Sequence, residues 1–74
     1  MKRADQDVLG SDEFLDVLEQ AVLRGKQVAV ELRDGTAFVD RITDLTAADG
    51  ADVAVFEARG RIVVANIRTL SHLG

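Results

Sequence analysis

The sequence predicts a mainly β domain in which an N-terminal helix precedes five short antiparallel strands that close into a small barrel. Two observations lead to this fold class. The spacing of apolar residues changes from a helical period to a period of two after Gly25. Short turns, two of them Asp-Gly, then separate the apolar runs without a further helical segment. A parallel sheet with crossover helices is therefore excluded, and closure into a barrel would leave few exposed strand edges.

Length and composition fit one globular domain. The 74 residues are 47% hydrophobic and 30% charged, and we expect residues 1–10 to form a flexible tail and residues 11–74 to form the domain. Cysteine is absent, which excludes disulfides and thiolate chemistry. No apolar run reaches the ~20 residues that cross a bilayer, and the N-terminus lacks the apolar core of a secretory signal. These features predict a cytoplasmic protein without membrane attachment.

The helix is predicted from about residue 12 to residue 24. Ser11 is a suitable N-cap, and two acidic residues follow it where the helix dipole favours negative charge. Arg24 and Gly25 provide the usual C-terminal signal. One apolar stripe, expected to cover an open end of the barrel, consists of Phe14, Leu15, Leu18, Ala21 and Val22.

The first two strands are predicted from alternation and from a tight turn. The Asp34-Gly35 pair is a strong signal for the turn between them. The second run, of about ten residues, is long enough to need bending in a small sheet. Its Phe38 and Ile42 share one face with Asp40, whereas Leu45 lies on the other face. The strand should therefore change its buried side partway along.

The remaining strands are expected to be shorter. We predict a polar loop over 46–52, a strand over 52–58, a turn at 59–60 and strands over 61–64 and 67–73. Inward positions on the strands should supply the core, with two helix residues covering it. The predicted core residues are Val28, Val30, Leu32, Phe38, Ile42, Val53, Val55, Ile62, Val64 and Ile67, covered by Phe14 and Leu18.

The excess negative charge is confined to the N-terminal part of the chain. The formal net charge is −4, and residues 1–23 alone carry six acids and two bases, whereas seven acids balance seven bases beyond them. The candidate partner-binding residues are the acids of the predicted helix, Asp12, Glu13, Asp16 and Glu19. They could pair with basic groups of a partner. They could equally serve the helix dipole and solubility, and the residues alone leave both interpretations open.

No group of residues predicts catalysis or a metal site. His72 is the only histidine, and its neighbour Ser71 would point to the opposite face of a strand. One imidazole with scattered carboxylates is too few ligands for a metal. Asp40 and Asp44 lie four apart in a strand, and we interpret both as solvated and not as an acid–base pair. We therefore expect no enzyme activity, no metal and no cofactor.

Tight binding of nucleic acid is not expected either. Arg59, Arg61 and Arg68 could form a small basic patch. Single-strand binders usually stack bases on exposed rings, but the only aromatic residues are three phenylalanines that fall on apolar patterns. The net charge also has the wrong sign for binding phosphates.

Four short motifs carry a resemblance to a known family, which covers nearly the whole chain from Ser11 onward. The first three each lie at the end of a predicted strand, and the fourth forms the last predicted strand. They are Leu32-Arg33-Asp34-Gly35, Asp44-Leu45, Glu57-Ala58 and Ile67-Arg68-Thr69-Leu70-Ser71-His72. After an acidic helical start, this order resembles the Rof family of Rho-binding antiterminators, which have an Sm-like (SH3-like) small barrel. The ring-forming Sm-like RNA binders usually have a glycine midway along the second strand, where this chain has Asp40.

The resemblance implies a small acidic regulator that binds the transcription termination factor Rho. It implies that acidic surface occupies the place where Rho takes up RNA, so that termination is inhibited by competition. Two alternatives stay open, an Sm-like RNA-binding ring subunit and a small module that mediates assembly. The oligomeric state is also open, with a monomer favoured.

Overall fold

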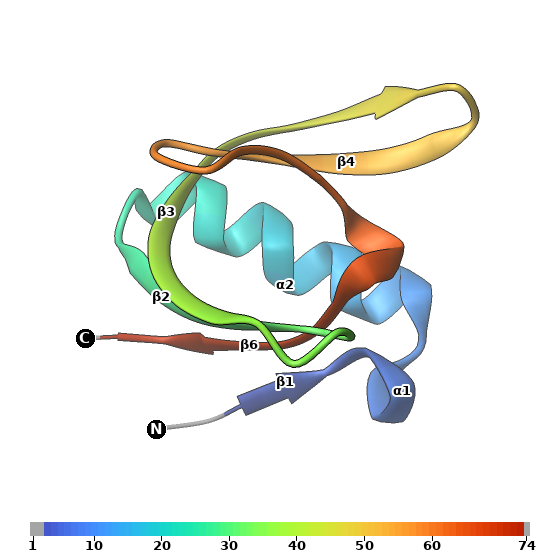
Figure 1. The fold of residues 1–74 in the computed structure, drawn as a ribbon, viewed down its shortest axis with the longest axis horizontal. Coiled ribbons are helices and arrows are strands. Elements are labelled where there is room, and N and C mark those ends of the chain that lie inside the picture. The colour runs from blue at the N-terminus through green and yellow to red at the C-terminus, as the bar shows by residue number, and fades with distance from the viewer. Residues whose placement is uncertain (1–2, 74) are drawn as a thin grey trace.

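A computed structural model describes residues 3–73 of the protein (Figure 1). The elements in order are β1 (Arg3–Asp5), α1 (Gln6–Leu9), α2 (Ser11–Arg24), β2 (Gln27–Leu32), β3 (Ala37–Ala48), β4 (Ala51–Phe56), β5 (Gly60–Val63), the 3₁₀ turn η1 (Val64–Asn66) and β6 (Ile67–His72). All neighbouring strands pair antiparallel in one sheet of order β1-β6-β2-β3-β4-β5. The mainly β fold with an N-terminal helix is thus confirmed.

The described part of the chain has six strands, one more than the sequence predicts. The additional strand β1 and the single-turn helix α1 lie in the segment expected to be a flexible tail. Ala4 of β1 stands opposite Leu70 of β6. Asp5 caps α1 by accepting a hydrogen bond of 2.9 Å from the amide of Asp7. Elements this short escape prediction because they span less than one recognisable hydrophobic period.

The long helix α2 begins one residue before its predicted start and ends where predicted. Gly10 occupies the N-cap without any side-chain hydrogen bond, so the predicted cap by Ser11 is wrong. Gly25 closes the helix as predicted: its φ of 63° is left-handed, and its amide donates to two carbonyls of the last turn. No helix within residues 3–73 is long and apolar enough to cross a bilayer.

The sheet curves strongly, and α2 runs across it (Figure 1). In β3 the pairing with β4 shifts register between Ile42 and Asp44. Such a bulge bends a strand and exchanges the faces of the residues beyond it. Ile42 is buried before the shift, and Leu45 packs against the core after it, which confirms the predicted change of side. The end strands β1 and β5 show no pairing with each other in the described residues, so the predicted closure into a barrel is not shown.

The β3–β4 hairpin is longer than the sequence predicts. A polar loop was expected over 46–52, but β3 continues through Ala48 and β4 begins at Ala51. Asp49 and Gly50 form the whole turn, with φ values of 52° and 78°. Positive φ at both positions gives the twist that a two-residue hairpin needs. The preference of Asp-Gly for a two-residue turn therefore decided the structure here, although the polar residues around it had indicated a longer loop.

The core contains most of the predicted residues. Phe38, Leu32, Val55 and Ile62 are only half-buried, and the ring of Phe38 meets that of Phe56 edge-to-face at 5.3 Å. The predicted residues that are buried are Phe14, Leu18, Val28, Val30, Ile42, Val53, Val64 and Ile67. Ala21, Ala54, Phe56 and Leu70 are buried in addition to them.

Polar side chains fasten the N-terminal segment to η1 and β6. The side chain of Gln6 is buried, and its Nε2 donates to the carbonyls of Val64 at 3.1 Å and Ile67 at 2.6 Å. Arg33 donates to both carboxylate oxygens of Asp7, at 2.9 and 3.2 Å, and its Nε donates to a carbonyl of η1 at 2.8 Å. These bonds hold the chain where it leaves β1.

Replacing Gln6 with alanine should loosen this attachment. The two carbonyls would lose their buried donor, which costs about 1–3 kcal/mol of unfolding free energy. We expect a lower denaturation midpoint and faster hydrogen exchange of the β6 amides. The matched control is Gln20→Ala on the exposed side of α2, which should change neither quantity. Unchanged exchange in β6 of the Gln6→Ala protein would contradict the role given to Gln6.

Candidate protein-binding surface

The four acids predicted to bind a partner are all exposed on α2. Asp12, Asp16 and Glu19 are spaced i, i+4 and i+7, so they lie on one face, opposite the buried stripe of the helix. Glu13 lies beside this face. The structure therefore brings three of the predicted residues together and places the fourth at their flank.

Among the residues that the structure describes, the acids of α2 have no charged partner. Within residues 3–73 none of them forms an ion pair or a side-chain hydrogen bond. The two ion pairs found there join Arg33 to Asp7 and Arg41 to Glu57. Arg59 lies over the ring of Phe38, with its guanidinium carbon 4.1 Å from the ring centroid. Several arginines are thus engaged internally, whereas the acids of α2 remain free to meet external bases.

Two adjoining grooves border this face, between α2 and the β3–β4 hairpin. Their volumes are about 350 and about 200 Å³, and Glu19 and Leu45 line both. The first is lined by Glu19, Val22, Leu23, Asp44 and Leu45, and the second by Leu15, Glu19, Leu45, Thr46, Ala47 and Asp52. Leucine and valine side chains thus alternate with carboxylates, an arrangement that suits a partner with basic and apolar side chains.

Asp44 and Asp52 are functional candidates that the sequence analysis missed. Both are exposed, and the grooves place both beside Glu19. We call Asp12, Asp16, Glu19, Asp44 and Asp52 the acidic surface. The Asp49-Gly50 turn was a sequence signal for the hairpin that carries two of them, but nothing local indicated that this hairpin lies against α2.

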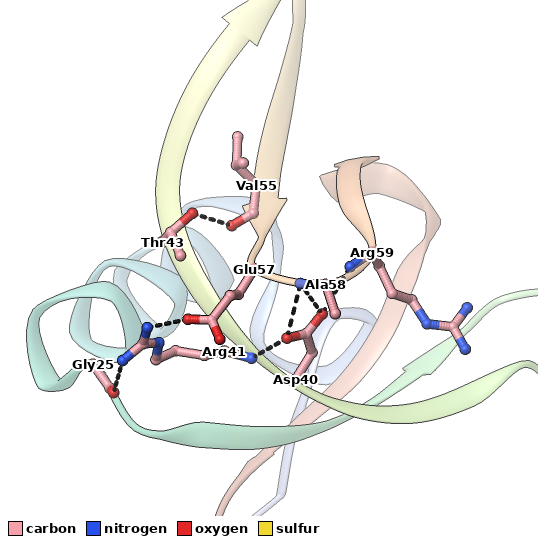
Figure 2. A network of polar contacts seen from close by, with 8 residues as sticks. All are labelled: Gly25, Asp40, Arg41, Thr43, Val55, Glu57, Ala58 and Arg59. Carbon is pink, nitrogen blue, oxygen red and sulfur yellow. Dashed lines mark hydrogen bonds and ion pairs between the residues drawn. The ribbon is translucent and has the colours of Figure 1, made fainter.

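Asp40 is not solvated, and that interpretation was wrong. It is buried, and its carboxylate accepts backbone hydrogen bonds from Arg41 at 2.7 Å, Ala58 at 3.0 Å and Arg59 at 3.0 Å (Figure 2). Burial raises its pKa, but the three amide donors and the charge of Arg59 outweigh burial and leave the pKa lowered. The carboxylate is therefore held ionised and anchors the β4–β5 turn, which gives it a structural role.

A second set of contacts ties β3 to the same turn and to the end of α2. Figure 2 shows the ion pair between Arg41 and Glu57, and Arg41 also donates to the carbonyl of Gly25 at 3.5 Å. The hydroxyl of Thr43 donates to the carbonyl of Val55 at 3.2 Å. Glu57 and Ala58, noted above as a sequence motif, thus serve to hold this turn.

His72, which the sequence analysis did not assign to a metal site, is half-buried on β6 and pairs with Val28 of β2. Within residues 3–73 no three side chains of His, Cys, Asp or Glu lie together as metal ligands would. Arg61 and Arg68 are both exposed, on β5 and β6.

Fold and surface together define a small antiparallel β domain with one exposed acidic helix face. No protein-family model, curated protein or solved structure matches the chain. The function must therefore be argued from the chain's own surface.

Proposed function

We propose that this protein is a small acidic regulator, built on an Sm-like barrel, that binds Rho and inhibits transcription termination by competing with RNA. The observation that supports this most is the charge arrangement. The acids along one face of α2 form no ion pair with any residue from 3 to 73, whereas Arg33, Arg41 and Arg59 are engaged within the molecule. The motif resemblance to the Rof family supplies the identity of the partner.

The geometry of the acidic surface suits competition with a nucleic acid. Carboxylates at i, i+4 and i+7 form a line along a rigid helix, and a nucleic acid likewise presents a line of negative charges. Basic groups of Rho that normally bind RNA phosphates would contact these carboxylates instead. Exposed charges of this kind mainly speed association and make it sensitive to salt. The two grooves beside the line add leucine and valine side chains to the carboxylates, which gives a partner apolar surface to contact.

The direct test is calorimetry of the full chain against the RNA-binding domain of Rho, at low and at physiological salt. We expect binding that weakens as salt rises. In a parallel experiment, the protein should displace labelled RNA from Rho. Absence of binding would refute Rho as the partner, and binding that leaves RNA in place would refute the competition mechanism.

The isolated protein should not itself bind RNA tightly. The acidic surface repels phosphates, and the described phenylalanines are buried or half-buried and offer no open stacking platform. Fluorescence anisotropy with labelled single-stranded RNA should show no saturation at low-micromolar protein. Low-micromolar affinity that survives physiological salt would instead favour an RNA-binding Sm-like subunit.

A further inference from the structure

The strand β4 carries apolar residues on both of its faces. Ala54 and Phe56 belong to the core, whereas Val53 and Val55 alternate with them and therefore point to the outer face of the sheet. Antiparallel strands with one face in water usually alternate apolar and polar residues, and a continuous apolar run is typical of a strand covered on both faces. The run from 53 to 56 thus indicates that the outer face of β4 is covered as well.

Val63 of β5 extends this outer face. It stands directly opposite Val53 in the β4–β5 ladder, so the two side chains lie on the same face. We call Val53, Val55 and Val63 the valine face. None of the three belongs to the core cluster or packs against it within residues 3–73. Val53 is buried and Val55 half-buried, but Val63 is 37% exposed, so the valine face still has apolar surface to offer.

Two charges of opposite sign stand at the ends of one cross-strand row on this face. Val55 pairs with Asp44 of β3 on one side and with Arg61 of β5 on the other. Directly opposite residues point to the same face, and both charged residues are exposed. Neither forms an ion pair with another residue of the described part of the chain. The row therefore has a negative end, an apolar centre and a positive end.

Such a row is complementary to a second copy of itself. A two-fold axis parallel to β4 exchanges the places of β3 and β5, so Asp44 of each copy faces Arg61 of the other while the valines meet at the centre. An axis across the strands would instead set like charges against each other. We propose that the valine face joins two copies of this chain sheet to sheet, with an Asp44–Arg61 ion pair on each side of the contact. A contact of three valines per copy is small, so the dimer should be weak and should form at high protein concentration.

This contact differs from the proposed contact with Rho. Arg61 and Val63 line neither acidic groove, although Asp44 borders both surfaces. Self-association is measured on the isolated protein without Rho. The dimer and the proposed function can therefore fail separately.

The first test is analytical ultracentrifugation of the full chain from low micromolar to millimolar concentration. We expect a monomer that converts to a dimer as the concentration rises. Val63→Lys places a charge in the apolar contact and should raise the dimer dissociation constant about tenfold or more. The matched control is Val39→Lys, at another exposed valine that lies outside the valine face, and it should leave the constant unchanged. Circular dichroism checks that both variants are folded.

The second test exchanges the charges. Asp44→Arg and Arg61→Asp each set like charges against each other in both pairs of a dimer and should weaken it about tenfold. Both substitutions in one chain restore opposite charges and should restore dimerisation. A one-to-one mixture of the two single variants should also dimerise better than either variant alone, because opposite charges then meet in both pairs.

The outcomes decide the proposal. A wild type that stays monomeric up to millimolar concentration would overturn it, as would equal dimerisation of the wild type and Val63→Lys. Single charge variants that the combined exchange does not rescue would overturn the two-fold arrangement. Species larger than a dimer would also contradict it and favour assembly through strand edges. If Val63→Lys does not fold, the charge exchange still decides, since Asp44 and Arg61 are exposed.

Discussion

The triple variant Asp12→Lys, Asp16→Lys, Glu19→Lys is expected to fold as the wild type does and to lose its binding to Rho. The three positions are exposed and form no ion pair with the described part of the chain, and exposed substitutions usually change stability by less than ~0.5 kcal/mol each. At the interface, the same changes set lysines against basic groups. Such contacts cost several kcal/mol, so the dissociation constant should rise by about 100-fold or more. Calorimetry measures the affinity, and circular dichroism confirms the fold.

Further variants decide which part of the acidic surface is used. Ala37→Lys adds a positive charge at the exposed start of β3, which lines neither groove, and should weaken binding little. Asp44→Lys with Asp52→Lys tests whether the hairpin side of the grooves takes part, and Glu13→Lys tests the flanking acid. A folded triple variant that binds Rho as tightly as the wild type would show that the partner is reached through another surface.

Replacing Asp40 with asparagine is expected to lower the unfolding free energy by about 2–3 kcal/mol, because the charge that three backbone amides share is lost. Asparagine also brings an NH₂ group that cannot accept from these amides. Urea unfolding at neutral pH measures the loss. The matched control is Asp44→Asn, since Asp44 is exposed and, within residues 3–73, accepts only from the amide of Leu45. Equal stabilities of the two variants would contradict the anchoring role.

Acid should remove the contribution of Asp40. The pKa of its carboxyl lies below the ordinary value of 3.8 in the folded protein, so the folded state favours the ionised form. Its contribution to stability is therefore complete above about pH 5 and declines as the pH falls through 3.8 and below. The stability gap between wild type and Asp40→Asn should narrow over this range. A gap that stays constant into acid would show that the carboxylate charge is not what stabilises the turn.

The local features of the fold could be read from the sequence because their causes are local. Gly25 ends α2 through its own left-handed backbone, and the change of buried side in β3 follows from the positions of Ile42 and Leu45 along one strand. The exposure of the acids on α2 follows from the stripe of apolar residues on the opposite face. Each of these properties depends on residues within a few positions of one another.

The sequence by itself determined the helix, most of the core and the side of the molecule that carries the excess negative charge. Only the tertiary structure decided that β1 covers β6, that Asp40 is buried and that Asp44 and Asp52 lie beside α2. These outcomes depend on contacts between distant parts of the chain. Gln6 bonds to a carbonyl 61 positions away, and Asp40 to an amide 18 positions away. Hydrophobic periodicity reports which face of an element is buried, but the packing of all elements together decides which neighbours that face meets.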